Sequence, residues 1–173
     1  MSINIEKALQ IEGWTSTEEL TWLAEQASIH TRVLEIGSYL GRSTRAIADN
    51  TKGFVYAVDK WDTVDLDGVT TPVSFDKFQV NMAGLHNFYT LRMPSLRASK
   101  GLRFTKFDMI FIDADHTYES VKADVLAWLP FLMPDGLLCG HDYNTECNPG
   151  VTKAVDELVP DKQVIDTIWY ARR

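Results

Sequence analysis

Two short segments of the chain combine carboxylates with imidazoles at the ends of apolar runs. Residues 112–116 read Ile-Asp-Ala-Asp-His, and residues 140–142 read Gly-His-Asp. Because side chains alternate along an extended segment, Asp113 and Asp115 are expected to point to the same side. If the two apolar runs form neighbouring strands, these acids and imidazoles meet at one edge of a sheet. Groups of these types hold a divalent cation or accept a proton.

Both kinds of chemistry stay open at this point. In one interpretation, the converging acids and imidazoles hold a hard divalent cation through oxygen ligands, with an imidazole suited to softer metals. In the other, the site has no metal, and Asp115, His116 or His141 accepts a proton. A third interpretation gives the histidines only capping or backbone contacts. Two such clusters at strand ends favour a functional role over that third interpretation.

A glycine turn lies between an apolar strand and a helix at residues 33–44, which read VLEIGSYLGRST. A strand, a tight turn and a helix N-terminus together form a binding site of nucleotide size. A second strand then ends in Asp59, which follows Gly37 by 59 − 37 = 22 positions. An acid about 20 residues after such a turn is suited to binding a ribose. The order of these features predicts a cofactor that contains a ribose.

The turn keeps only the outer two glycines of a dinucleotide fingerprint, and Tyr39 stands at the middle position. This side chain leaves less room for a pyrophosphate, which disfavours NAD. S-adenosylmethionine fits better, because its amino-acid end can bond the backbone of the turn and its ribose can bond Asp59. Trp61 is a candidate to stack on the adenine, with plain packing as the alternative. Glu35 is expected to act at the cofactor, with bracing of the turn as its alternative.

The bulk composition indicates one globular domain over residues 1–173. The chain is 45% apolar and 24% charged, and its net charge is −7. No basic stripe of the kind that binds nucleic acid stands out, so a nucleic-acid substrate is not expected. Cys139 and Cys147 lack the spacing of a zinc site or a disulfide framework. With no signal peptide pattern and no apolar run of about 20 residues, we expect a cytoplasmic protein without a membrane span.

The elements that must position these residues alternate regularly along the chain. Ser16 with Glu19 forms a capping-box pattern at the start of the first amphipathic helix. A polar loop over 60–73 follows the carboxyl end of a strand, where loops face the ligand. Helices are expected over 16–28, 43–50, 74–86, from 94, over 118–129 and over 151–158, and strands over 32–37, 54–59, 88–92, 107–113, 136–141, 163–166 and 168–171. This alternation predicts a three-layer, doubly wound α/β domain with a largely parallel sheet.

Taken together, the chain resembles class I S-adenosylmethionine-dependent methyltransferases. It is most similar to the small-molecule O-methyltransferase group that carries a D-x-D-H-x-Y segment and a later H-D-Y. The similarity extends from about Gly13 to the end of the chain, and its motifs are jointly specific. The matching residues are 35–44, Asp59, 113–118, 141–143, and the stretch from Pro149 to Trp169.

The resemblance implies a Rossmann-like sheet of seven strands, mostly parallel, with the last strand antiparallel. It also implies a cofactor over the carboxyl ends of the first two strands. Relatives often have Gly-Asp-Ser near the adenine where this chain has Met93-Pro94-Ser95, so only the serine is retained. The cofactor-binding residues expected here are Glu35, Gly37, Ser38, Gly41, Ser43, Asp59, Trp61, Ser95 and Asp113.

The resemblance further implies roles for the two acid and imidazole segments. Family members often bind magnesium through an aspartate that matches Asp113 and an acidic pair that matches His141 and Asp142. The histidine in that pair departs from the pattern and puts magnesium in question. The acid that matches Asp115 acts as the general base in related sugar O-methyltransferases, so Asp115 is the first candidate for the base and His116 the second.

The expected function is transfer of the methyl group of S-adenosylmethionine to an oxygen of a small polar acceptor, with or without a metal. The alternative is a non-catalytic accessory subunit that binds S-adenosylmethionine, or a homologue that supports hydroxylation. The sequence leaves self-association open, because Trp14, Trp22 or Trp169, if exposed, would provide an apolar surface that favours it.

Overall fold

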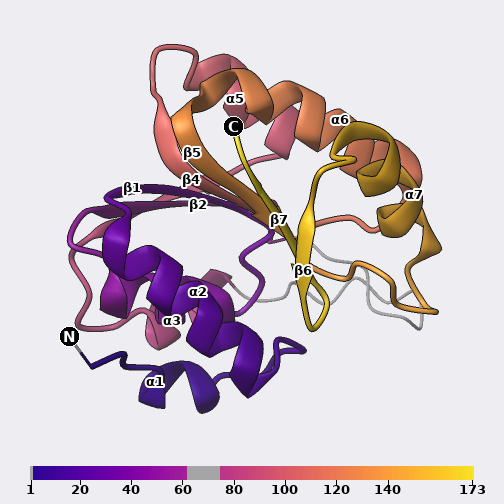
Figure 1. The fold of residues 1–173 in the computed structure, drawn as a ribbon. Coiled ribbons are helices and arrows are strands. Elements are labelled where there is room, and N and C mark those ends of the chain that lie inside the picture. Colours follow the sequence, from indigo (N-terminus) through magenta and orange to yellow (C-terminus); the bar gives the residue numbers. More distant parts are fainter. Residues whose placement is uncertain (1, 62–74) are drawn as a thin grey trace.

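Helices and strands alternate along the chain in the computed structural model, which describes residues 2–61 and 75–173 (Figure 1). The expected loop over 60–73 lies outside the described residues except for Lys60 and Trp61. The helices are α1 (Glu6–Leu9), α2 (Thr17–Ile29), α3 (Arg42–Asn50), α4 (Phe75–Asn81), α5 (Ser95–Gly101), α6 (Tyr118–Trp128) and α7 (Pro149–Leu158), with the 3-10 turn η1 (Leu129–Phe131) after α6. The strands are β1 (Arg32–Ile36), β2 (Phe54–Asp59), β3 (Phe88–Arg92), β4 (Phe107–Ile112), β5 (Leu132–Gly140), β6 (Gln163–Ile165) and β7 (Ile168–Arg172).

The strands form one seven-stranded sheet in the order β3-β2-β1-β4-β5-β7-β6. β1 pairs in parallel with both β2 and β4, and β4 pairs in parallel with β5. β7 runs antiparallel to β5 and to β6. This topology confirms the expected doubly wound sheet, mostly parallel with its last strand reversed.

Helices cover both faces of the sheet, which makes three layers (Figure 1). On one face, Trp22 and Leu23 of α2 and Ile47 of α3 pack on alternate strand residues such as Val33 and Phe111. On the other face, α5, α6 and α7 pack on the intervening strand residues, including Ile110 and Ile112. Side chains that alternate between the two faces are therefore apolar in both directions, as expected of a buried parallel sheet.

Most element boundaries follow the local signals in the sequence. Ser16 accepts a hydrogen bond from the backbone N–H of Glu19, whose carboxylate accepts one from Ser16, so the predicted capping box is present. The helix expected over 74–86 ends at Asn81, and the chain then turns through Gly84 with a φ of 83°. The single turn α1 was not predicted, because four residues are too few to show helical periodicity.

The segment before α2 is fixed to the start of α3. Arg42 donates hydrogen bonds to the carbonyl oxygens of Ile11 (2.6 Å) and Thr15 (2.9 Å). Between them, Trp14 is 78% exposed and its ring lies 5.3 Å from that of Tyr39. Trp22 and Trp169 are buried, so Trp14 is the one of the three named tryptophans that meets solvent. No helix in the described part of the chain has both the length and the apolar composition to cross a membrane.

The direction of winding reverses between β1 and β4, and there the two strands come very close. Gly37 follows β1 with a φ of 90°, and a Cβ at this position would lie 1.9 Å from the carbonyl oxygen of Asp113, which follows β4. Glycine is required here for two reasons, its backbone conformation and the lack of space. In open α/β sheets, ligands bind at this switch point.

We predict that Gly37→Ala destabilises the fold by more than about 3 kcal/mol, because backbone atoms must move apart. Gly84→Ala is a matched control, since Gly84 also has a positive φ but a Cβ there would meet no atom within 4 Å. The control is expected to cost about 1–2 kcal/mol. Urea denaturation measures both free energies of unfolding. Equal losses of unfolding free energy in the two variants would mean that the close approach of Asp113 adds no cost to a side chain at position 37.

Candidate functional site

The glycine turn and both acid and imidazole segments lie at the carboxyl edge of the sheet. Backbone hydrogen bonds continue past the strand ends and hold these segments together. Three backbone N–H groups donate to carbonyl oxygens of the neighbouring strand: that of Gly37 to Val58 (2.8 Å), that of Asp113 to Ile36 (2.8 Å), and that of His141 to Ile112 (3.1 Å). The predicted adjacency of the strands that precede Asp113 and His141 is confirmed by the pairing of β4 with β5.

The glycine turn is closed by Asp59 at the end of β2. One carboxylate oxygen of Asp59 accepts the backbone N–H of Tyr39 (2.8 Å), and the other accepts that of Trp61 (2.8 Å). Tyr39 takes a positive φ of 45°. Gly41, with a φ of 90°, precedes α3 and offers no side chain to cap it. The first N–H groups of α3 are thus suited to an anionic ligand group.

Glu35 in β1 supports the turn from behind. Its carboxylate is fully buried and accepts hydrogen bonds from the hydroxyls of Ser38 (2.7 Å), Ser43 (2.6 Å) and Thr44. Burial raises the pKa of Glu35 to about 7 despite these hydrogen bonds. All of these contacts brace the turn, so a direct contact of Glu35, Ser38 or Ser43 with a cofactor stays a prediction.

Two further residues expected at the cofactor also make internal contacts. Trp61 is 1% exposed, donates its indole N–H to the carbonyl oxygen of Tyr39 (2.7 Å), and packs on phenylalanine rings of α4. Ser95 donates to Asp124 (2.5 Å) and accepts from the indole of Trp128 (2.7 Å). Burial raises the pKa of Asp124 to about 6. Stacking of Trp61 on adenine and contact of Ser95 with adenine remain predictions.

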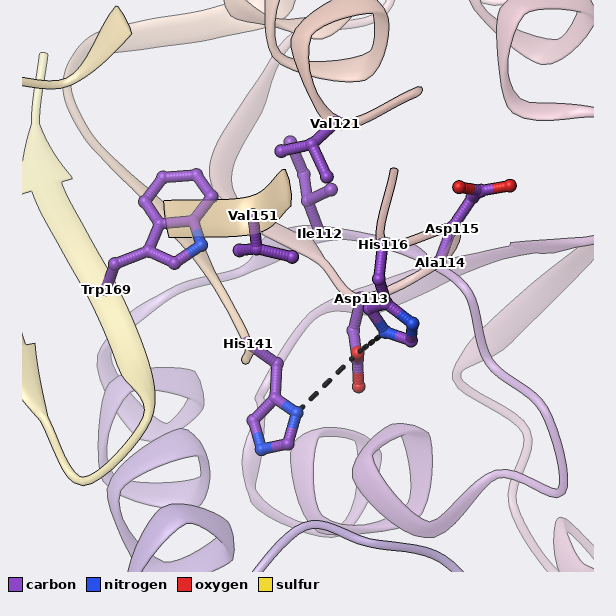
Figure 2. Close-up of a pocket in the computed structure, with 9 residues that line it drawn as sticks. All are labelled: Ile112, Asp113, Ala114, Asp115, His116, Val121, His141, Val151 and Trp169. Atoms are coloured by element: carbon purple, nitrogen blue, oxygen red, sulfur yellow. Dashed lines mark ion pairs between the residues drawn. The ribbon is translucent and has the colours of Figure 1, made fainter. Parts of the chain in front are cut away.

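Four side chains converge beyond the ends of β4 and β5. His116 Nε2 lies 2.8 Å from Asp142 Oδ2 and 3.7 Å from Asp113 Oδ1. His141 Nδ1 lies 3.7 Å from the same oxygen of Asp113 and 3.6 Å from that of Asp142. Figure 2 shows the carboxylate of Asp113 between the two imidazole rings. We call these four residues the Asp/His cluster.

The charges of the cluster strongly shift the pKa values of His116, His141 and Asp142. The carboxylates of Asp113 and Asp142 raise the pKa of His116 to about 10. Burial alone would lower the pKa of His141, but the carboxylates of Asp142 and Glu19 raise it to about 11. Burial alone would raise the pKa of Asp142, but the two imidazoles lower it. The carboxylates around them thus favour the protonated form of both imidazoles.

Asp115 does not join the cluster. Its carboxylate points away from Asp113 and His116 in Figure 2, because the chain leaves the extended conformation after β4 and turns toward α6. The expectation that Asp113 and Asp115 point the same way is thus not met. Asp115 is exposed and accepts the backbone N–H of Thr117 (2.8 Å), which lowers its pKa. Asp115 is therefore an ionised, solvent-facing carboxylate beside His116.

Glu19 is a site residue that the sequence analysis missed. It is 2% exposed, and its Oε2 accepts from His141 Nε2 (3.0 Å) as well as from Ser16 N–H (2.7 Å). Its Oε1 accepts from both the hydroxyl (2.6 Å) and the N–H (3.2 Å) of Thr167. Burial alone would raise the pKa of Glu19, but the hydrogen bonds from His141 and Thr167 lower it to about 2. The capping-box pattern identified the residue but not its second partner.

The cluster contains a set of atoms suited to a divalent cation. One ligand atom each from Asp113, His141 and Asp142 lies within 4.8 Å of the others. Two carboxylates and one imidazole are the donors found in many transition-metal sites. These residues thus fit a metal, although His116 now occupies one carboxylate of the set.

Comparison with known proteins identifies the family. Residues 34–143 match a family described as a methyltransferase domain, and the chain belongs to this family. The matched region runs from β1 through the Asp/His cluster. A search of curated proteins found no match.

Solved structures share the fold, and they include two proteins that are named as methyltransferases. The cofactor-bound Rv0187 from MTB has a TM-score of 0.75 at 19% identity, over 97% of this chain and 85% of that one. The calicheamicin methyltransferase CalS11 has a TM-score of 0.66 at 15% identity, over 88% and 76%. The O-methyltransferase NovP has a TM-score of 0.63 at 18% identity, over 90% and 79%. The resemblance to class I S-adenosylmethionine-dependent methyltransferases is thus confirmed for family and fold.

The buried carboxylate of Glu35 leads to a prediction about pH and stability. Because its pKa is raised in the folded state, the unfolded chain loses this proton first as the pH rises from about 4.5 to about 7. Stability from this group is therefore present below that window and declines through it. At ~1.4 kcal/mol per pKa unit, the decline is on the order of 3 kcal/mol.

We predict that Glu35→Gln removes this decline, so that its free energy of unfolding, measured in urea, falls less than that of the wild type between pH 4.5 and 8. The exposed Glu25→Gln is the control and is expected to keep the wild-type slope. Parallel curves for the wild type and Glu35→Gln would contradict a raised pKa at this position.

Proposed function

We propose that the protein transfers the methyl group of S-adenosylmethionine to an oxygen atom of a small polar acceptor. One observation carries this proposal beyond the family assignment. The glycine turn, closed by Asp59, and the Asp/His cluster share the carboxyl edge at the switch point, where Gly37 touches Asp113. A cofactor held on the turn would therefore lie next to charged groups that can handle an acceptor hydroxyl.

The residues of the turn would bind the cofactor. The N–H groups at the start of α3 would receive its carboxylate, as helix N-termini do for anions. Asp59 retains lone pairs beyond the two that Tyr39 and Trp61 occupy, and these would accept the ribose hydroxyls. When bound, S-adenosylmethionine supplies an electrophilic methyl group. The main contribution of the protein to such a transfer is alignment of the acceptor oxygen with this methyl group.

The exposed loop after β4, which carries Asp115 and His116, would orient and deprotonate the acceptor. His116, held at Nε2 by Asp142, can donate from its other ring nitrogen and orient the acceptor oxygen. Asp115 is ionised and accessible, so it would take the hydroxyl proton as the oxygen bonds to the methyl carbon and the bond from that carbon to sulfur breaks, which leaves S-adenosylhomocysteine. Alternatively, once His116 has left Asp142, the residues Asp113, His141 and Asp142 would hold a divalent cation, and this ion would polarise the acceptor oxygen as a Lewis acid.

Asp59→Ala is predicted to weaken binding of S-adenosylmethionine at least about 10-fold, because hydrogen bonds to a charged group are lost. Isothermal titration calorimetry measures this effect. Asp108→Ala is a matched control, since Asp108 also accepts two backbone N–H groups, those of Thr31 and Arg32, but at the opposite end of β1. The control is expected to lose stability and keep its affinity. Unchanged affinity in Asp59→Ala would reject the assigned ribose site.

Asp115→Asn and His116→Asn separate the two roles on the acceptor loop. Asp115→Asn is predicted to lower kcat by about 10²-fold or more, because the proton acceptor is lost, while cofactor affinity stays intact. His116→Asn is predicted to raise KM for the acceptor as well. Normal turnover in Asp115→Asn together with a large loss in His116→Asn would move the base to His116.

The alternative function, a non-catalytic S-adenosylmethionine-binding subunit, keeps support from the exposed position of the acceptor loop. Production of S-adenosylhomocysteine with a panel of hydroxylated small molecules distinguishes the two. The proposal expects product with at least one acceptor. Tight cofactor binding with no product across the panel would favour the accessory subunit.

A further inference from the structure

The orientation of His141 is fixed by a residue that is distant in the sequence and adjacent in the fold. Glu19 is buried and accepts from His141 Nε2 at 3.0 Å, and the two residues are 122 positions apart. The same carboxylate accepts from Ser16 and Thr167, so it cannot rotate away without losing several hydrogen bonds. An ionised carboxylate is only an acceptor, so the hydrogen of this contact belongs to Nε2.

The other ring nitrogen of His141 faces the two aspartates without a close hydrogen bond. Nδ1 lies 3.7 Å from Asp113 Oδ1 and 3.6 Å from Asp142 Oδ2, beyond hydrogen-bond distance from either. The side chain is only 6% exposed, so solvent reaches this nitrogen poorly. A buried imidazole nitrogen thus points into a space that two carboxylate oxygens border.

We propose that Glu19 positions His141 as a nitrogen ligand, and that the cluster of this protein selects a divalent transition-metal ion over magnesium. A carboxylate that accepts from the far nitrogen of a ligand imidazole fixes its tautomer and raises its basicity. A metal ion that binds Nδ1 would displace the proton that this nitrogen carries when His141 is paired with the aspartates. Magnesium prefers oxygen ligands and water, whereas cobalt and zinc accept imidazole readily. The inference rests on the proposed function in one respect, since the ion would lie beside the acceptor oxygen.

His116 lies where a metal ion would have to bind Asp142. Its Nε2 occupies the Asp142 oxygen that a metal would share with Asp113 and His141. His116 is partly exposed and lies on a loop, so it can withdraw while His141 stays fixed. Glu19 therefore preforms the buried part of the site, which is His141. At the exposed part, Asp142 would exchange its partner between the imidazole of His116 and a metal ion.

The test measures binding of Co²⁺ and Mg²⁺ to the protein after treatment with a chelator. Calorimetry gives the affinity of both ions, and the visible absorption of Co²⁺ reports its binding independently. We expect Glu19→Gln to weaken Co²⁺ binding 10–100-fold, the usual effect of losing a partner behind a ligand. Ser16→Ala is the matched control, because it removes the capping hydroxyl of α2 and leaves the contact of Glu19 with His141 in place. It is expected to lower Tm and to keep Co²⁺ affinity within about 2-fold of the wild type.

His141→Asn tests the selectivity separately and covers the case in which Glu19→Gln folds poorly. An amide oxygen replaces the imidazole nitrogen, so the ratio of Co²⁺ to Mg²⁺ affinity is expected to fall at least 10-fold. The proposal is wrong if the wild type binds no Co²⁺, if Glu19→Gln binds it normally, if Ser16→Ala loses as much affinity as Glu19→Gln, or if His141→Asn keeps the wild-type ratio.

These outcomes are independent of the proposed function. Methyl transfer by protein that does not bind Co²⁺ would reject this inference and keep the transferase. Tight, Glu19-dependent Co²⁺ binding without methyl transfer to any acceptor would do the reverse.

Discussion

The contact between Gly37 and the backbone of Asp113 is the constraint on which the site depends. A side chain at position 37 would overlap the carbonyl oxygen of Asp113, so the turn after β1 and the end of β4 can meet only through a glycine. This contact stands at the point where the sheet reverses its winding, between the two halves of the fold. The expected cofactor turn and the charged cluster are neighbours because of it.

The groups around this contact are held by carboxylates that face inward. Glu35 binds three hydroxyls behind the turn, and Asp59 binds two backbone N–H groups in front of it. Their partners come from the turn itself, from α3 and from Trp61 after β2, so the turn has little freedom left. A rigid turn is what alignment of a small methyl group requires, since misplacement by a single ångström is costly in such reactions.

The sequence was sufficient for the parts of this arrangement that depend on local patterns. Alternation of strands and helices predicted the sheet, and the apolar run before Asp113 predicted β4. Contacts between distant segments could not be predicted in this way. Glu19 was recognised as a capping residue, but its contact with His141 depends on how α2 packs against the end of β5. Asp115 was expected beside Asp113 because the strand was assumed to continue. In the structure the chain turns toward α6 instead, and the carboxylate of Asp115 accepts the N–H of Thr117 within this turn.

The bonds of Glu19 also have a consequence for the order in which the protein is made. Its partner Thr167 lies 148 positions later, and its partner His141 lies 122 positions later. While the chain is being synthesised, Glu19 can cap α2 early, but it can bond His141 only after β5 has been made, and Thr167 later still. Contacts between such distant residues are slow to form. The cluster and its support therefore mature only after residues 141 to 167 have been made, and a chain that stops before them presents the first half of the fold without an assembled site.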